Sequence, residues 1–318
     1  MLVTRPLPPP VRPGDRVGVA ALSGPILAER LEAGVETLVR LGFEPVLATN
    51  LGSRSRLFAG PDDERLEAFH RLAADPTLSA IFFARGGYGI LRVLERLDWE
   101  LLARYPRAYV GYSDVTPFLN LVVHRLGWCA FHGPMPAVEM ADDLTSDEEI
   151  SLLGALGGEL PATLPVQPVL PGASRSVEGP LLGGCLSLLT ATLGTGLATS
   201  LDHSILFWED VDEPLYRLDR MLTHLWLSGS LTSLRGMVVG RVQAVDDEPC
   251  GGSSPEAGGL EQVLAEWADG VDWPVATGLD SGHCRPNLTL PLGARARLDP
   301  ARGHLVVGLP TDNRDADD

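Results

Sequence analysis

Short apolar segments alternate with amphipathic segments through the first half of the chain. Residues 16–21, 44–48 and 80–84 are predicted strands, and every residue of the third is apolar. Such a composition is typical of a parallel strand that is buried on both faces of its sheet. Residues 28–41, and a segment that opens at residue 61, carry their apolar residues at helical spacing. The alternation predicts right-handed βαβ units, and therefore an α/β fold around a parallel sheet.

A serine lies on a predicted tight turn between a further strand and a helix. The turn reads Val110-Gly111-Tyr112-Ser113-Asp114; Pro117 suits the first turn of the helix and Gly127 suits its end. This is the arrangement of a nucleophile elbow, and free N–H groups at the helix start can stabilise an oxyanion. The simpler interpretation is that Ser113 or Asp114 only caps the helix.

A glycine-rich loop, Arg85-Gly86-Gly87-Tyr88-Gly89, directly follows residues 80–84, and a helix is expected after it. Because ligands bind beyond the carboxyl ends of parallel strands, this loop and the serine turn are expected to be neighbours. The glycine spacing does not match a dinucleotide-binding fingerprint. It suits a close approach of a backbone N–H to a reacting oxygen.

Length and charge limit the other function classes. A chain of 318 residues favours two domains, and a net charge of −17 argues against nucleic acid or an anionic membrane as partner. Residues 179–201 carry no charge, but their glycines and acidic flanks favour a buried segment over a membrane span. The N-terminus has no signal-peptide pattern, so we expect a soluble cytoplasmic protein.

Prolines divide the chain. Four prolines between residues 161 and 171 predict a linker over 161–178, between an N-terminal domain (1–160) and a C-terminal domain (179–311). Residues 312–318 predict a disordered acidic tail. The C-terminal domain is expected to contain strands at 204–209 and 236–240 and helices at 215–227 and 260–267.

A serine nucleophile needs a base, and the base needs an orienting carboxylate. His132 and His283 both follow predicted strands within glycine-rich turns, so each is a candidate base. Glu209 ends the strongest predicted strand of the second domain and is the candidate carboxylate.

Two other chemistries are less favoured. The acidic run 209–213 could bind a hard cation, but no histidine or cysteine shares it, and a solvated turn is as compatible. The four cysteines are far apart and form no Cys-x-x-Cys pair. Cys284 adjoins His283, but neighbouring side chains on a turn usually point apart, so inert thiols are favoured.

Five short motifs in order resemble those of the LD-carboxypeptidase family, serine peptidase family S66. They lie at residues 84–89, 111–114, 183–187, 208–210 and 282–293, and the resemblance runs from about residue 13 to residue 309. The family includes murein tetrapeptide LD-carboxypeptidases and microcin C self-immunity peptidases. The resemblance implies a Rossmann-like N-terminal domain and a C-terminal swivelling β/β/α domain.

The resemblance also implies the site. Ser113 would be the nucleophile, Glu209 the acid and His283 the base, and the site would lie between the domains. The backbone N–H groups of Gly87 and Asp114 would form the oxyanion hole. No metal or cofactor is expected, and a homodimer is. Cys185 departs from the family pattern, which more often has asparagine there, so a polar role at that position is in doubt.

The implied activity is hydrolysis of the bond between an L-diamino acid and D-alanine in murein tetrapeptides during cell-wall recycling. Arg85 and Arg285 are candidates by charge and position for binding the terminal carboxylate of such a peptide. An alternative is a microcin C-type immunity peptidase that cleaves a peptidyl- or aminoacyl-nucleotide. No Phe, Tyr or Trp lies between His132 and Leu206 for base stacking, which disfavours it. A non-catalytic binding module would be expected to lack a member of the triad, and all three are present.

Overall fold

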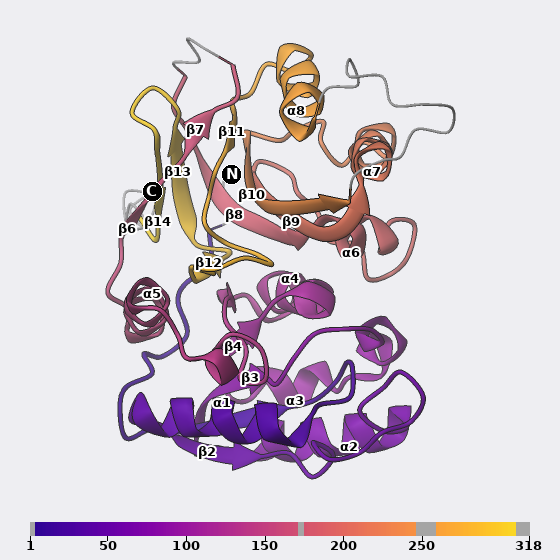
Figure 1. Cartoon of the computed structure of the whole chain (residues 1–318), viewed down its shortest axis with the longest axis vertical. Coiled ribbons are helices and arrows are strands. Elements are labelled where there is room, and N and C mark those ends of the chain that lie inside the picture. The colour runs from indigo at the N-terminus through magenta and orange to yellow at the C-terminus, as the bar shows by residue number, and fades with distance from the viewer. Residues whose placement is uncertain (1–3, 171–174, 246–258, 310–318) are drawn as a thin grey trace, which may run out of the picture.

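Two sheets, one above the other along the long axis, make up the molecule (Figure 1). The computed structural model describes residues 4–170, 175–245 and 259–309. The predicted acidic tail, residues 312–318, lies outside them. The α/β class with a parallel sheet and a second sheet is confirmed.

The first sheet has the strand order β12-β5-β4-β3-β1-β2, and all its neighbours are parallel except β12 and β5. Its strands from the first half of the chain are β1 (Arg16–Ala20), β2 (Glu44–Leu47), β3 (Leu78–Phe83), β4 (Ala108–Gly111) and β5 (Ala130–His132). The helices of this half are α1 (Ala28–Arg40), α2 (Asp62–Ala74), α3 (Trp99–Ala103), α4 (Thr116–Leu121) and α5 (Ser146–Gly157).

The second sheet has the order β6-β14-β13-β8-β9-β10-β11-β7, and its central strands β8 to β11 are parallel. The strands are β6 (Ala162–Pro165), β7 (Gln167–Pro168), β8 (Val177–Cys185), β9 (Ile205–Pro214), β10 (Gly236–Val245), β11 (Val275–Thr277), β13 (Arg295–Asp299) and β14 (His304–Val307). Its helices are α6 (Leu186–Ala191), α7 (Leu215–Leu227) and α8 (Leu260–Asp269).

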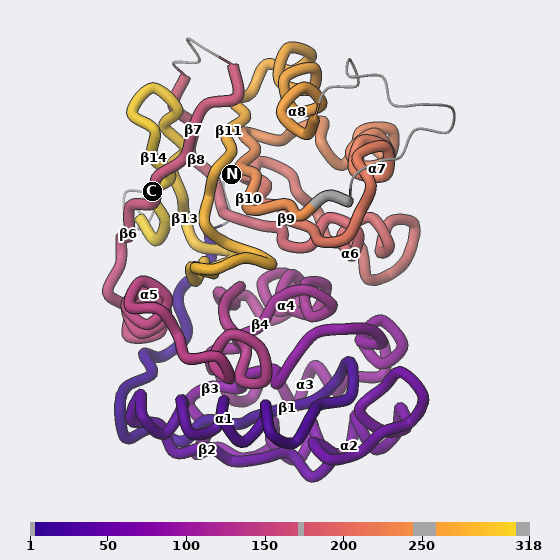
Figure 2. Tube along the Cα trace, in the orientation of Figure 1, coloured from indigo at the N-terminus to yellow at the C-terminus, as the bar shows by residue number. Residues whose placement is uncertain are grey.

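One late strand returns to the first sheet. β12 (Leu290–Leu292) pairs antiparallel with β5, so that Leu290 lies opposite His132. In Figure 2 the orange-to-yellow trace comes down from the second domain to lie beside the purple half of the molecule. The segment that carries His283 is therefore anchored to both sheets.

Two expectations differ from the structure. Residues 161–178 were expected as a linker, but they contain β6 and β7, which form the two edges of the second sheet. Proline is tolerated on edge strands because one side needs no N–H donor. The helix expected after Gly89 is instead two 3-10 turns, Ile90–Arg92 and Leu94–Arg96. The extended backbone of Leu97 and the cap formed by Asp98 end this segment before an α-helix can develop.

Candidate active site

Ser113 lies at the expected sharp turn. β4 ends at Gly111, and a 3-10 turn from Ser113 to Val115 leads into α4. The φ angle of Ser113 is +62°, a left-handed value that few residues other than glycine adopt. The end of the helical run at Gly127, with φ +83°, is also as predicted. A strained serine between a buried strand and a helix is an observation that favours function over capping.

The second domain brings His283 and Glu209 to this serine. His283 Nε2 lies 3.1 Å from Ser113 Oγ, and His283 Nδ1 lies 2.6 Å from Glu209 Oε2. The main-chain N–H of His283 donates to the same carboxylate oxygen, over 3.1 Å. Because a carboxylate accepts, the ring proton belongs on Nδ1, which leaves Nε2 free to take the proton of the serine.

Each partner is held by a strand or a tight turn. Glu209 is fully buried on β9, in register with Cys185 of β8. His283 follows Gly282, whose φ is +115°. A Cβ on Gly282 would lie 2.6 Å from Glu209 Oε2, so only glycine lets this turn approach the carboxylate so closely.

The carboxylate also sets the charge preference of the imidazole. Burial by itself would lower the pKa of His283, but the hydrogen bond and the negative charge of Glu209 outweigh burial, and the pKa is raised. The Tyr112 ring packs edge-on against the His283 ring, with centroids 4.9 Å apart. The imidazole is thus fixed by contacts on its edge and its face.

The glycine-rich loop lies against the serine, as expected. A Cβ on Gly86 would lie 2.8 Å from Ser113 Cβ and 3.3 Å from the Asp114 nitrogen. Gly87 follows with φ +107° and is exposed. The expected oxyanion hole of Gly87 and Asp114 N–H groups stays a prediction.

The side chain of Asp114 connects the glycine-rich loop to the serine turn. The buried carboxylate accepts the Ile90 N–H over 2.9 Å, and burial raises its pKa. It therefore fixes the start of the 3-10 turn that follows the glycine-rich loop, and it ties that loop to the serine turn.

The two arginines expected to bind substrate differ in their surroundings. Arg85 Nη1 donates to the Pro25 carbonyl over 3.0 Å. Arg285 forms an ion pair with the fully buried Glu148, at 3.1 Å, and donates to the carbonyls of Asp142 and Asp143. Its guanidinium thus already holds the start of α5, and a substrate would have to share it. Both assignments stay predictions.

His132, the other candidate base, packs on the same Tyr112 ring as His283 but makes no hydrogen bond to Ser113 or Glu209. It is fully buried, its ring packs on Tyr112 and Phe207, and neither ring nitrogen has a partner among the described residues. Burial lowers its pKa to about 4. It is a neutral packing group between the domains. Both histidines follow a predicted strand within a glycine-rich turn, so the sequence pattern could not distinguish His132 from His283.

Asp210 of the acidic run and the neighbouring Cys185 make contacts that stabilise the fold. Asp210 accepts the Ser187 N–H over 2.7 Å at the start of α6, so it caps that helix. No cluster of three potential metal ligands occurs among the described residues. Cys185 Sγ lies 3.5 Å from an Asp210 oxygen, and burial raises the pKa of its thiol.

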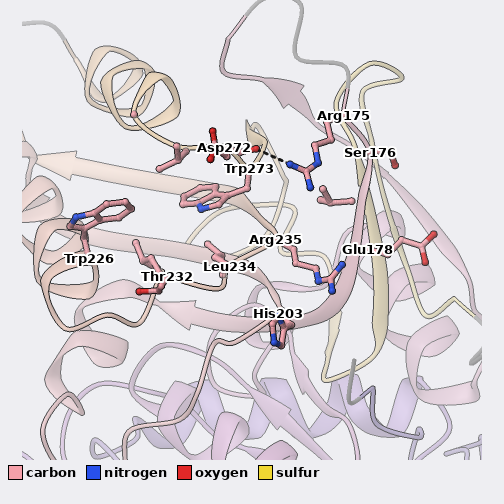
Figure 3. Close-up of a pocket in the computed structure, with 14 residues that line it drawn as sticks. Arg175, Ser176, Glu178, His203, Trp226, Thr232, Leu234, Arg235, Asp272 and Trp273 are labelled. Atoms are coloured by element: carbon pink, nitrogen blue, oxygen red, sulfur yellow. Dashed lines mark hydrogen bonds between the residues drawn. The ribbon is translucent and has the colours of Figure 1, made fainter. Parts of the chain in front are cut away.

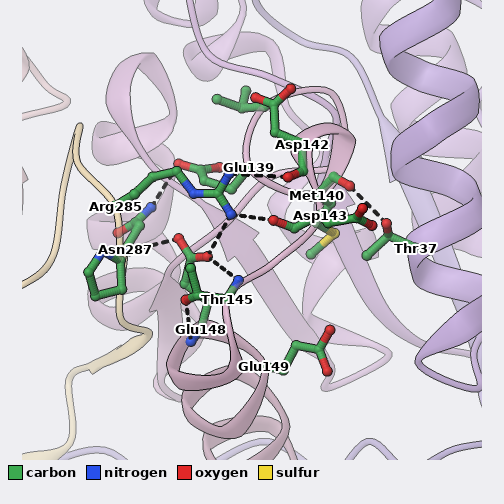
Figure 4. Close-up of polar contacts among 12 residues, drawn as sticks. Thr37, Glu139, Met140, Asp142, Asp143, Thr145, Glu148, Glu149, Arg285 and Asn287 are labelled. Carbon is green, nitrogen blue, oxygen red and sulfur yellow. Dashed lines mark hydrogen bonds and ion pairs between the residues drawn. The ribbon is translucent and has the colours of Figure 1, made fainter.

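Polar residues of both domains meet in a group of which only Arg285 was a candidate from the sequence (Figure 4). Glu139 and Glu148, both buried, come from the first domain, and Arg285 and Asn287 come from the second. Asn287 lies within the motif at residues 282–293. The two glutamates gave no signal, because their partners are more than 130 residues away in the sequence.

A cavity of about 790 Å³ opens elsewhere on the second domain (Figure 3). His203, Arg235 and Trp273, which precede β9, β10 and β11, are among the residues that line it. The cavity thus lies at the amino ends of parallel strands, whereas Glu209 lies further along β9. Ligands of open parallel sheets usually bind at the carboxyl ends, which favours the cluster of Ser113, His283 and Glu209 over this cavity as the candidate site.

The sequence matches both domains of one family. Residues 17–133 match the LD-carboxypeptidase N-terminal domain and residues 178–298 match the LD-carboxypeptidase C-terminal domain. The chain belongs to the LD-carboxypeptidase family. No helix among residues 4–170, 175–245 and 259–309 has the length and apolar character needed to cross a membrane.

Relatives of this LD-carboxypeptidase family member have two kinds of name. A murein tetrapeptide carboxypeptidase of Pseudomonas aeruginosa is 33% identical over 296 residues, 90% of this chain and 94% of its own. The microcin C7 self-immunity protein of Escherichia coli is 28% identical over 322 residues, 91% and 92% of the two chains. The crystal structure of a muramoyltetrapeptide carboxypeptidase from Oxalobacter formigenes has a TM-score of 0.83 at 28% identity and covers 93% of this chain and all of its own. The chain is therefore a carboxypeptidase-family hydrolase.

Proposed function

We propose that the chain is a serine LD-carboxypeptidase that removes the terminal D-alanine from murein tetrapeptides. The observation that carries the proposal is the continuous contact from Ser113 Oγ through His283 to Glu209, across two domains. Hydrolysis of an amide by an activated serine needs this set of contacts. The names of relatives that cover nearly the whole chain supply the substrate class.

In the proposed mechanism, Ser113 attacks the carbonyl carbon of the bond before the terminal D-alanine, while His283 Nε2 takes the hydroxyl proton. Glu209 stabilises the imidazolium that forms. The proton then passes to the leaving amine, and a water molecule hydrolyses the acyl-enzyme by the same route. The N–H groups of Gly87 and Asp114 would stabilise the oxyanion, each by roughly 2.7–4 kcal/mol if they act like other single donors.

The direct test is mass spectrometry of a murein tetrapeptide incubated with the protein. We expect release of one alanine and accumulation of the tripeptide. A tetrapeptide with L-alanine at the terminus serves as the matched control and should stay intact. An intact D-alanine peptide, in the presence of protein that reacts with a fluorophosphonate, would exclude this substrate class.

The raised pKa of His283 makes activity depend on pH in a defined direction. The base acts only when neutral, so kcat/KM should fall as the pH falls through a pKa that lies above the ordinary 6.5 of histidine. In Glu209→Gln the negative charge is lost, and the midpoint of the acidic limb should move to lower pH while the maximum rate falls. A pH profile of kcat/KM for both proteins measures this. An unchanged midpoint in the variant would exclude Glu209 as the cause.

A second candidate is hydrolysis of a peptidyl- or aminoacyl-nucleotide amide, which the microcin relative favours. The same triad would act, and only the leaving group would differ. Parallel mass spectrometry with a peptidyl-nucleotide distinguishes the two substrates by which of them is consumed.

We further propose a role in cytoplasmic recycling of murein peptides and a homodimeric state. Fractionation of cells and light scattering of the purified protein test these.

A further inference from the structure

A buried chain of hydrogen bonds connects the first domain to the turn that holds His283. Asn287 is fully buried, and its side-chain oxygen accepts the Gly282 N–H over 2.9 Å. Its side-chain NH₂ donates to Glu139 Oε1 over 3.1 Å. Gly282 directly precedes His283, so the hydrogen bond from Gly282 to Asn287 fixes the backbone position from which the His283 side chain extends.

Glu139 acts on the imidazole from a second direction. Its carboxylate is hydrogen-bonded to the hydroxyl of Tyr112, whose ring packs edge-on against His283. Glu139 Oε2 accepts the Met135 N–H over 3.0 Å. These three partners can all donate to the Glu139 carboxylate. Burial raises the pKa of Glu139, and the hydrogen bonds from these donors oppose that rise.

From these contacts we infer that Glu139 and Asn287 form a positioning pair, which places His283 against Ser113 only when the two domains are assembled. The inference rests on the proposed function, because it takes His283 as the base that acts on Ser113. Glu139 and Asn287 themselves touch neither substrate nor reacting atoms. A buried polar network of this kind is costly unless every member is satisfied. Precise placement of the base gives this network a function, because a misplacement of about 1 Å can cost about 100-fold in rate.

A pair of substitutions that exchanges donor and acceptor tests the inference. In Glu139→Gln, an NH₂ group faces the NH₂ of Asn287, or else the Met135 N–H. In Asn287→Asp, two carboxylates face each other. The double variant places the new amide against the new carboxylate, so it restores the hydrogen bond with reversed polarity, and the new carboxylate can still accept the Gly282 N–H.

We expect each single variant to lose about 10- to 100-fold in kcat on the alkaline plateau, with KM changed little, because misplacing a catalytic group by about 1 Å can cost this much. The double variant should recover to within several-fold of the wild type. A double variant no more active than the weaker single variant would overturn the inference. Glu149→Gln is the matched control: this glutamate pairs with Arg40 at the surface and should leave kcat unchanged.

Two readouts separate this inference from the substrate assignment. The first is the rate of fluorophosphonate labelling of Ser113, which needs no peptide. The second is the low-field NMR resonance of the His283 Nδ1 proton, which reports the 2.6 Å contact with Glu209 without any reaction. We expect both to be impaired in the single variants and recovered in the double variant, even if murein peptides prove not to be the substrate.

A third variant covers the case in which a single variant does not fold. Tyr112→Phe keeps the ring against His283 and removes only the hydroxyl from Glu139. It should lower the labelling rate several-fold and shift the low-field resonance, because the Glu139 carboxylate loses one of its hydrogen bonds and can move. If labelling rate and resonance are both unchanged in this variant, the inference is wrong.

Discussion

Replacing Ser113 with alanine is expected to abolish peptide cleavage and fluorophosphonate labelling together. Loss of a triad nucleophile typically lowers kcat by about 10⁴- to 10⁶-fold, because only binding and oxyanion stabilisation remain. Rates of D-alanine release and intact-protein mass spectrometry after labelling measure the two effects.

The backbone of Ser113 calls for a second variant at the same position. Its φ of +62° is strained for alanine and unstrained for glycine. Ser113→Gly should therefore match or exceed the wild type in thermal stability and still be inactive. Ser228→Ala, at an exposed serine after α7, is the control and should keep full activity. Labelling that persists in both Ser113 variants would remove the proposed nucleophile.

Replacing Gly282 with alanine is the second change for which we expect a large effect. The added Cβ would lie 2.6 Å from both Cγ and Oε2 of Glu209, inside any normal contact distance. The turn must move away, and the His283 N–H and ring lose their common acceptor. We expect kcat/KM to fall by about 100-fold or more, since the base no longer meets the serine.

A neighbouring glycine provides the control for backbone strain. Gly278 also has a positive φ, +81°, but a Cβ there would come no nearer than 3.9 Å to a side-chain atom of Gln167. Gly278→Ala should lose about 1 kcal/mol or more in the free energy of unfolding and keep its activity. Equal losses of kcat/KM in the two variants would mean that strain, and not the contact with Glu209, is responsible.

The sequence alone was sufficient for the elements that depend on local patterns. The parallel strands, α7 at Leu215–Leu227 and the glycine end of the α4 segment follow from apolar spacing and from glycine at a helix end. Ser113 could be recognised as a candidate because a strand-to-helix turn is local. Its pairing with His283 and Glu209 came from a family resemblance, since 170 residues separate the serine from the histidine.

Contacts between segments that are distant in the sequence could not be predicted from local patterns. Glu139 and Glu148 look like ordinary acidic residues near α5, and only the fold places Asn287 against both of them. The same limitation applies to residues 161–178: short edge strands have too few residues to show alternation, and their prolines suggested a linker. His132 and His283 have similar local sequences, and only the fold shows that His283 contacts Ser113 and Glu209 while His132 is fully buried without a hydrogen-bond partner among the described residues.

The return of β12 to the first sheet has a consequence for biosynthesis. β5 ends at residue 132, but its outer neighbour comes from residues 290–292. At roughly 5–20 residues per second, the ribosome needs on the order of 10 s to make the intervening segment. During that time the N-terminal half must carry an unpaired strand edge, which is a site for aggregation. We therefore expect the nascent chain to bind chaperones during translation, and we expect the N-terminal half expressed by itself to be less soluble than the full chain.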